Sequence, residues 1–483
     1  MPIIYNDYSF DTTNEKLINI LTSQADIYAV QRGYFYRTDP FDLCDDYMLP
    51  SCFGNNSGSP YFSCAMEDAP GQSVPSFVEV ASGKYLSFRM GFNEAIIITG
   101  KTPPEVKYFS YCAFVTTRHS KNQSETAKHF KVMPLRNKPT KFQRSAIERD
   151  LVFTCLGEPI NNLKINTPGT PEGAPGCPYD QPFLLIFTGN QNLQQEIYKS
   201  ALQAGYSPNS LNMITMPRDI ANFGVAERST DTFSLLARIS SESMDEPDMK
   251  KYLLNPEISV VRITANTITG PALPIPYLTP RGTGTTEFRY SKAIDTLRDK
   301  IVEHYSNDYD AVDIPTDIWL DESYIAIQQG VNDLGESRDT VYFGSGSFKL
   351  PEDAFIVVYG ANHAKTGKCT YCNAVVYGQR YENGVVSASN KEFENSALLY
   401  LEDPKADYLY AYKFGYYDDP SEYYKKIPSY DPEEDLPCKR HTSALDPNEE
   451  IFLGFRAYLE PTTKVGPAWN ELALDKVIVF LKK

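Results

Sequence analysis

The sequence lacks the features of several large classes of protein. None of its apolar runs approaches the roughly 18–20 residues that a membrane-spanning helix needs. Positive charge is scarce, because 46 Lys and Arg residues stand against 62 Asp and Glu residues, and the formal net charge of −16 would repel a nucleic-acid backbone or an anionic lipid surface. The 5 histidines form no pair at i, i+2 or i, i+4 spacing, so the usual pattern of a metal site is missing. We therefore expect no membrane span, no nucleic-acid partner, no metal and no cofactor.

Cysteine is also sparse. The 9 cysteines are too few for a disulfide scaffold, but Cys44, Cys52 and Cys64 lie close together in a stretch rich in Gly, Ser, Asn and Pro, which resembles a disulfide-linked loop region. Cys369 and Cys372 form a C-x-x-C pair, which by itself indicates redox or metal chemistry. In a strand, however, residues three apart point to opposite faces, and no second pair completes a zinc site. The pattern therefore disfavours a redox or metal role for these two residues.

Aromatic residues are abundant. The 34 Tyr and 26 Phe residues, with only 2 Trp, favour strands and half-buried surfaces over helices. A chain of 483 residues exceeds the size at which single cores stop growing, which is about 250–300 residues. We therefore expect a soluble, acidic, strand-rich protein with more than one domain.

The first 149 residues predict an N-terminal β-rich domain that also carries the cysteine-containing loops. Residues 84–116 read as three strands, and the turn Gly100-Lys-Thr-Pro-Pro separates the last two.

Residues 150–270 predict a small α/β domain. A buried strand over 183–187 is followed by Asn190 and by a helix whose apolar residues share one face, and Gly205 ends this helix. Further strands are expected over 211–216 and 258–264, with a helix over 231–238 between them.

Residues 271–483 predict a helix followed by a C-terminal β-rich domain that carries the candidate site. The proline-rich connector 271–280 marks the boundary, a helix is expected over 290–305, and strands dominate from about residue 339. The expected fold is therefore α+β and strand-rich, with β-sandwich-like N- and C-terminal parts and a small α/β layer domain between them.

The first candidate loop follows the expected strand 353–359. This strand delivers Tyr359, Asn362 and His363 to a tight loop, and loops at strand ends often present reactive groups. His363 is a candidate general acid or base, because its charge changes near neutral pH. The alternative is a hairpin loop whose polar side chains satisfy their own backbone.

The second candidate loop follows the expected strand 451–458. That strand presents Arg456, and the loop after it holds Glu460, Lys464, Asn470 and Glu471. Two carboxylates near a lysine can form an acid/base pair with separated pKa values. A solvated ion network is the alternative.

A third candidate is the segment Arg281-Gly-Thr-Gly-Thr-Thr-Glu, directly ahead of a helix. Backbone N–H groups at a helix start, with Arg281 beside them, can hold a phosphate or carboxylate. A threonine helix cap reached through a flexible turn is the alternative.

These segments resemble a family of largely uncharacterised proteins, many of them bacterial and exported. The resemblance rests on Tyr359-Gly-Ala-Asn-His-Ala-Lys-Thr-Gly-Lys and on Tyr458-Leu-Glu-Pro-Thr-Thr-Lys-Val-Gly-Pro, and it covers about residues 75–483. It implies one folded unit with an unusual C-terminal site and an exported origin, but no activity. With export implied, we expect at least two of Cys44, Cys52 and Cys64 to be in disulfides.

Two functional hypotheses follow. The first is an enzyme that uses acid/base chemistry on a small or medium organic molecule, with His363, Glu460, Lys464 and Glu471 as catalytic residues. Its substrate-binding candidates are Arg281, Asn362, Arg456, Tyr359 and Asn470. The alternative is a non-catalytic, β-rich binding or surface protein in which these residues build hairpin loops.

The N-terminal residues lack a basic start and an apolar segment, so both a cytoplasmic protein and one secreted or lumenal after signal removal stay open, as does the oligomeric state.

Overall fold

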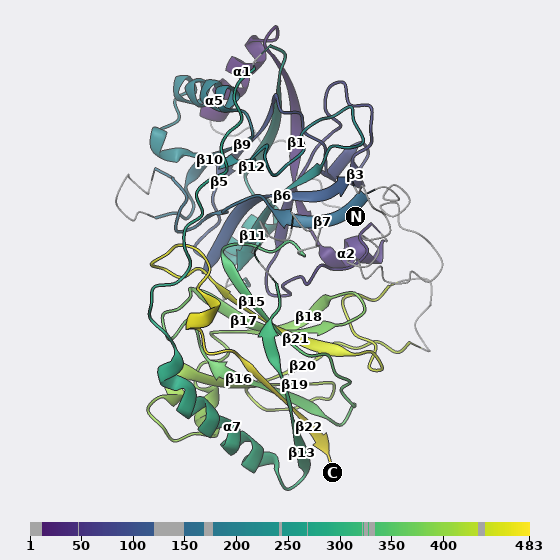
Figure 1. The fold of residues 1–483 in the computed structure, drawn as a ribbon, viewed down its shortest axis with the longest axis vertical. Coiled ribbons are helices and arrows are strands. Elements are labelled where there is room, and N and C mark those ends of the chain that lie inside the picture. Colours follow the sequence, from purple (N-terminus) through teal and green to yellow (C-terminus); the bar gives the residue numbers. More distant parts are fainter. Residues whose placement is uncertain are drawn as a thin grey trace.

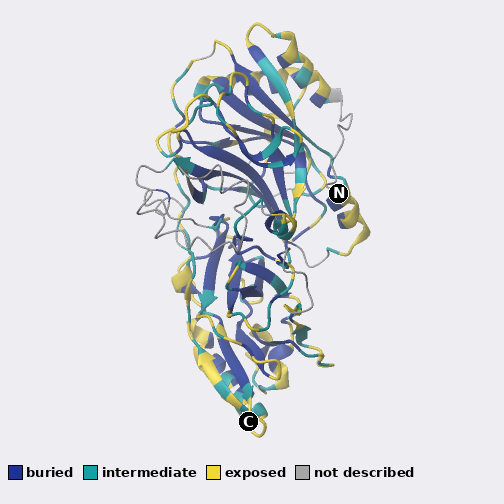
Figure 2. Cartoon of the chain, turned by 90° about the vertical axis from the view of Figure 1, so that its right-hand side faces the viewer, coloured by how far each residue is buried: buried dark blue, intermediate teal, exposed yellow. Residues whose placement is uncertain are grey.

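The structure, a computed structural model, confirms a strand-rich α+β fold with several sheets. It describes residues 12–46, 48–119, 149–168, 177–240, 244–267, 269–320, 322, 327, 334–432 and 440–483. Figure 1 shows two parts stacked along the long axis, an N-terminal part above and a C-terminal part below. In both parts the strands are mostly buried, and exposed residues gather on helices and loops (Figure 2).

The N-terminal part is built on a ten-stranded sheet with the order β10-β9-β5-β12-β1-β2-β11-β6-β7, in which β8 pairs with β6. A two-stranded sheet of β3 (Phe77–Ala81) and β4 (Lys84–Ser87) lies beside it. The strands of the large sheet are β1 (Tyr28–Thr38), β2 (Tyr61–Ala65), β5 (Glu94–Lys101), β6 (Tyr108–His119), β7 (Arg149–Cys155), β8 (Ile160–Asn161), β9 (Pro182–Thr188), β10 (Leu211–Thr215), β11 (Thr232–Ser240) and β12 (Ile258–Ala265). The helices that the structure describes in this part are α1 (Thr12–Ser23), α2 (Pro40–Asp45), α5 (Gln191–Ala204) and α6 (Pro247–Leu254).

Strands from residues 1–149 and from residues 150–270 are interleaved in this sheet. The pairs β1 with β12, β5 with β9 and β6 with β11 each join one segment to the other. The boundary expected between residues 149 and 150 therefore falls inside one sheet. The physical reason is that the partners of each strand lie far away in the sequence, whereas the boundary was drawn from local composition.

The predicted β-α-β unit of the middle segment is present at one end of the sheet. Strands β9 and β10 are parallel, and α5 connects them. The Asn190 side chain accepts a hydrogen bond from Leu193 N at the start of α5, and Gly205 ends the helix at a φ of 105°, where glycine is favoured. The helix expected over 231–238 is wrong, because this segment is β11, whose backbone pairs with β2 on one side and β6 on the other.

The large sheet has a core on each face. One core joins side chains of β1, β2, β6 and β11 to those of β5, β9 and β12, which means that the sheet folds back over its own inner face. The other core is covered by α1 and α5, which pack on β5, β9 and β12.

The C-terminal part is a sandwich of two five-stranded sheets with the orders β13-β22-β16-β19-β20 and β14-β15-β21-β17-β18. Alternate side chains of both sheets meet in one core between them. The strands are β13 (Tyr309–Ile314), β14 (Thr316–Ile318), β15 (Thr340–Ser345), β16 (Phe355–Ala361), β17 (Tyr371–Gly378), β18 (Asn383–Ser389), β19 (Leu409–Gly415), β20 (Tyr424–Lys426), β21 (Ile451–Tyr458) and β22 (Lys476–Lys482). Short 3-10 turns occur at Pro208–Ser210 in the N-terminal part and at Phe288–Tyr290, Ser396–Leu399, Ala406–Tyr408 and Trp469–Glu471 in this one.

The predicted helix near residues 290–305 is α7 (Ser291–Tyr305), which covers the outer face of the first of these sheets. The outer face of the second sheet turns toward the N-terminal part. From it, Tyr458 packs on Tyr108 of β6, and Asn373 donates a hydrogen bond to Asn56 at 2.8 Å. The two parts are therefore joined through buried aromatic and polar contacts.

Candidate functional site

A cavity of about 110 Å³ lies where the two parts meet. A buried water occupies about 10–15 Å³ on a comparable measure, so the cavity has room for a small molecule. Its walls come from strands of both parts and from the loop around Cys52. Apolar and aromatic side chains make most of the wall, together with a few hydroxyls and two arginines. The lining includes Leu43, Leu49, Phe53, Val78, Leu86, Phe153, Leu236, Leu320, Leu334, Arg238 and Arg456.

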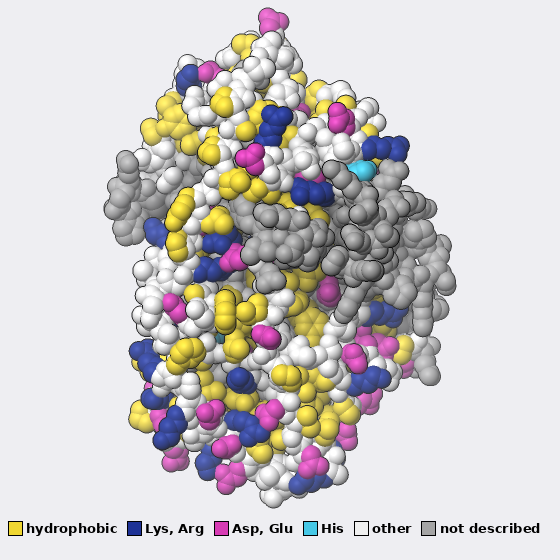
Figure 3. Space-filling model, viewed as in Figure 1, with side chains coloured by type: hydrophobic (Ala, Val, Ile, Leu, Met, Phe, Trp, Pro, Cys, Tyr) yellow, Lys and Arg dark blue, Asp and Glu magenta, His cyan; other side chains and the backbone are white. Residues whose placement is uncertain are grey.

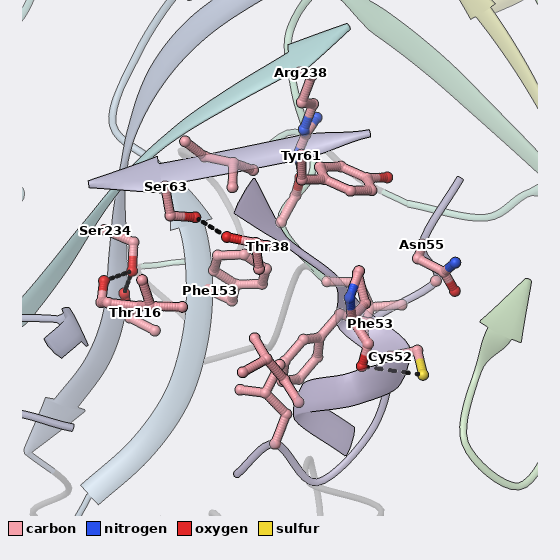
Figure 4. A pocket seen from close by; sticks show the side chains of 18 of the residues that line it. Thr38, Cys52, Phe53, Asn55, Tyr61, Ser63, Thr116, Phe153, Ser234 and Arg238 are labelled. Atoms are coloured by element: carbon pink, nitrogen blue, oxygen red, sulfur yellow. Dashed lines mark hydrogen bonds between the residues drawn. The ribbon is translucent and has the colours of Figure 1, made fainter. Parts of the chain in front are cut away.

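Four of the hydroxyls that line the cavity are hydrogen-bonded to one another in pairs. Thr38 donates to Ser63 at 2.9 Å, and Thr116 and Ser234 share a hydrogen bond of 2.8 Å. Figure 4 shows these two pairs and, close to Tyr61, the side chain of Arg238. These hydroxyls are therefore satisfied without a ligand.

The two arginines reach the cavity from opposite parts of the molecule. Arg238 on β11 is 8% exposed, and Arg456 on β21 is 4% exposed. Arg238 donates to Gly335 O and, at 3.5 Å, to Tyr342 Oη. Arg456 donates to Gly54 O and Tyr377 Oη, and its guanidinium lies 5.5 Å from the ring centres of Trp319, Tyr342 and Tyr377. Sequence analysis named Arg456 as a binding residue but missed Arg238.

The backbone around this cavity is unusual. Phe53, Val78, Phe153 and Leu334 all have positive φ, between 23° and 59°, and all line the cavity. Side chains that carry a Cβ rarely adopt this conformation, and it costs of order 1–3 kcal/mol for each residue. Such strain clusters at functional sites.

Three of the four predicted catalytic residues, His363, Glu460 and Glu471, lie in a separate, buried polar cluster between the end of β16, the segment before α7 and the end of β21. His363 is at its centre. Its Nδ1 lies 2.8 Å from Glu287 Oε2, and its Nε2 lies 3.3 Å from Asp475 Oδ2. Burial acts to lower the pKa of His363, but the charges of Glu287 and Asp475 outweigh it and raise that pKa well above its usual value. His363 is therefore a cation held between two carboxylates.

The second centre of this cluster is Lys368. Its Nζ contacts Glu460 and lies 2.5 Å from Glu471 Oε2 and 3.1 Å from Thr285 O. Burial acts to lower the pKa of Lys368, but the two carboxylates raise it. The backbone N–H groups of Thr283 and Gly284 donate to Glu471. The structure thus brings the three predicted loops together.

The other predicted residues have different surroundings. Arg281 pairs with Glu322 at 2.7 Å and donates to Thr340 O, so it belongs to an ion network. Asn362 donates to Asn390 O and accepts from Lys365 N, as in the hairpin alternative. Tyr359 packs in the core under α7. Lys464 and Asn470 are exposed.

Sequence analysis missed four residues that matter here. Glu287 and Lys368 lie in segments that it quoted, but local sequence does not show which side chain of a loop turns inward. Asp475 and Arg238 gave no local signal, because each lies in or beside a strand of ordinary composition.

The cysteines in the described ranges are thiols. The disulfide expected among Cys44, Cys52 and Cys64 is therefore not formed in this structure. Cys44 and Cys52 are hydrogen-bonded neighbours, whereas Cys64 lies in the apolar core, where burial raises the pKa of its thiol. The Cys112 and Cys155 sulfurs, which the sequence did not single out, lie 2.7 Å apart.

Asp339 links the two parts beside the cavity. Its carboxylate accepts hydrogen bonds from Asn161 Nδ2 at 2.7 Å and from Tyr108 Oη at 3.2 Å. Burial raises the pKa of Asp339 to about 7, against the opposing effect of Lys164 and these hydrogen bonds, whereas Glu158 adds to the rise.

The raised pKa of Asp339 predicts a pH-dependent stability. Because the folded-state pKa lies above the unfolded value of 3.8, the stability that this group contributes is present at low pH and is lost as the pH rises toward 7. We expect Asp339→Asn, which imitates the protonated acid, to gain on the wild type by up to about 1.4 kcal/mol per pH unit between pH 4 and 7. Urea unfolding at several pH values measures this difference. Asp313→Asn, at an exposed ion pair with Arg298, is the control, and a pH-independent difference for Asp339→Asn would contradict the prediction.

The described residues were also compared with the requirements of a metal site and of a membrane-spanning helix. In these ranges, no group of three or more His, Cys, Asp or Glu side chains could hold a metal ion. None of the helices that the structure describes is both long and apolar enough to cross a membrane. On the face in Figure 3, basic and acidic side chains are interspersed over the C-terminal part.

Comparisons with known proteins give distant structural similarities. No family model and no curated protein matches the sequence. An uncharacterised protein from Burkholderia cenocepacia is 10% identical, with 98% of this chain and 86% of that chain covered and a TM-score of 0.35. The VPA0106 protein from Vibrio parahaemolyticus is 8% identical, with 97% and 96% covered and a TM-score of 0.34. Similarities at this level do not indicate an activity.

Proposed function

We propose that this protein binds a small organic molecule in the cavity between its N-terminal and C-terminal parts. The observation that carries the proposal is a mostly apolar cavity of about 110 Å³, walled by both parts and bordered by four residues with strained backbone. Small-molecule sites are typically concave, mostly apolar and placed where structural units meet. The proposal agrees with the binding-protein alternative from the sequence.

The acid/base proposal receives less support from the geometry. Both ring nitrogens of His363 face carboxylates, and Lys368 is surrounded by protein acceptors. A general acid or base must reach a substrate proton over hydrogen-bond distance. Lys464, which was expected to share this task, is exposed and outside the cluster. We therefore assign the cluster a structural role, in which it fixes three loops together.

Binding of the uncharged fluorescent probe 1-aminonaphthalene tests the proposed function. We expect one bound probe per chain, measured by fluorescence titration. Leu236 on β11 lines the cavity, so Leu236→Phe and Leu236→Trp fill it progressively and should weaken binding, the Trp variant by about tenfold or more.

The matched control is Leu202→Trp, on the outer surface of α5, where the leucine is 38% exposed. This variant should bind the probe like the wild type. Binding that is absent in the wild type, or equal in all four proteins, would overturn the proposal.

A further inference from the structure

The region of the cavity around Arg238 and Arg456 has more hydrogen-bond donors than acceptors. Tyr61, Tyr342 and Tyr458 line it with them. Five donor side chains from the two parts of the molecule therefore lie around the same space.

The three tyrosine hydroxyls accept hydrogen bonds from the protein. Tyr61 Oη accepts from Asn56 N at 2.7 Å, and Tyr458 Oη accepts from Asn56 Nδ2 at 3.1 Å. Tyr342 Oη accepts from Ser337 N at 3.2 Å and from Arg238. Tyr342 also has the Thr340 hydroxyl beside it as a hydrogen-bond partner, whereas among the described residues no acceptor is paired with the phenol proton of Tyr61 or Tyr458, although buried tyrosine hydroxyls usually find such a partner.

The two guanidinium groups lack a counter-charge. Across the described ranges, neither Arg238 nor Arg456 forms an ion pair with an Asp or Glu, and Arg238 Nε is buried without a hydrogen-bond partner. Arginine stays charged in proteins, and a buried charge without a partner is costly. The aromatic rings around Arg456 offset only part of this cost. An anion between the two side chains would supply the missing charge and accept the spare protons.

The rest of the cavity wall determines the chemistry of the ligand's uncharged part. Away from the arginines, the lining consists mainly of leucine, valine and phenylalanine side chains and of hydroxyls that are already paired. A ligand that fills the cavity therefore needs an apolar body as well as a charged end.

We propose that the ligand is an amphipathic organic acid whose carboxylate lies between Arg238 and Arg456 and whose apolar body extends toward Leu236 and Phe153. Planar guanidinium groups match the geometry of a carboxylate, and the phenol protons of Tyr61 and Tyr458 add donors to it. This inference rests on the proposed function, because it specifies the class of molecule that the same cavity binds.

Calorimetric titration with three probes of one chain length tests it: octanoate, the uncharged octanamide and the cationic octylammonium. We expect octanoate to bind with an affinity at least about tenfold above that of octanamide, and octylammonium not to bind. Equal affinity for octanoate and octanamide would overturn the carboxylate inference and leave the proposed function intact. If none of the three probes binds, the carboxylate inference is overturned. The 1-aminonaphthalene titration then decides whether the proposed function, binding of a small molecule in the cavity, is overturned as well.

Variants of the two arginines locate the charged end. Arg238→Met and Arg456→Met should each weaken octanoate binding by about tenfold and weaken octanamide binding by less, so that the preference for octanoate falls, while Arg→Lys at either position should lose less. Arg298→Met, at the exposed pair of Arg298 with Asp313 beside α7, is the control and should change neither affinity. If either methionine variant fails to fold, the lysine variant and the wild-type probe series still decide the result. Unchanged octanoate affinity in the folded variants would overturn the inference.

Discussion

Replacement of His363 by alanine should lower the free energy of unfolding by about 3–5 kcal/mol, which is the usual cost of removing one partner of a buried ion pair. The reason is that the variant keeps the two buried carboxylates that the imidazole ring contacts. Glu287 and Asp475 are 1% and 3% exposed, and both face the imidazole ring. Without the ring, two buried carboxylates lose their shared cation, and the hydrogen bonds from Thr366 and Ala473 to Glu287 do not replace it.

Urea unfolding at pH 7 measures this effect. Lys365→Ala is a matched control in the same loop, because Lys365 is 41% exposed and lies 3.6 Å from Glu394, so its loss should change stability by less than about 1 kcal/mol. An H363A protein as stable as the wild type would contradict the structural role and return His363 to the catalytic candidates.

Replacement of Lys368 by methionine should have an effect of similar size, about 3–5 kcal/mol at pH 8, because Glu460 and Glu471 then face each other without a cation. The loss should depend on pH. Two close carboxylates raise the pKa of one of them, so in the variant this group binds a proton more tightly in the folded than in the unfolded state, and stability should recover as the pH falls toward 5.

Lys464→Met is the control for this prediction. Lys464 belongs to the loop that also carries Glu460, but its side chain is exposed, so we expect a change within about 0.5 kcal/mol at either pH. A K368M loss that is the same at pH 5 and pH 8 would show that the two carboxylates do not repel each other.

Sequence patterns predicted helices and strands correctly where the determining residues are close together in the chain. The start of α5 at Asn190, its end at Gly205 and the apolar face of α7 depend on residues within a few turns of each other. The segment 231–238 shows the limit of this reasoning. Its composition suits either structure, and it becomes β11 because β2 and β6 offer hydrogen-bonding edges from elsewhere in the chain.

The candidate site was predicted only in part, because local sequence indicates which loops are polar but not which of their side chains turn inward. Sequence reasoning expected polar loops to meet at the ends of strands, and the loops that carry His363 and Glu460 do meet. It chose Lys464 as the partner lysine, whereas the fold turns Lys368 inward. It grouped Arg456 with these loops, but Arg456 lies on the face of β21 that borders the cavity, opposite Arg238 from the other part of the chain. Only the tertiary structure brings those two residues together.

The pairing of β1 also has a consequence for how the protein is made. Tyr28 pairs with Ala265, so the first half of β1 has no partner strand until the ribosome has synthesised nearly the whole N-terminal part. Contacts between residues so far apart slow folding, because a long loop must close before they form. A nascent or truncated chain that ends before β12 would leave the edges of β1 and β5 open, and such edges recruit strands from other molecules. We therefore expect the edges of β1 and β5 to be covered only once the chain has been synthesised through residue 265.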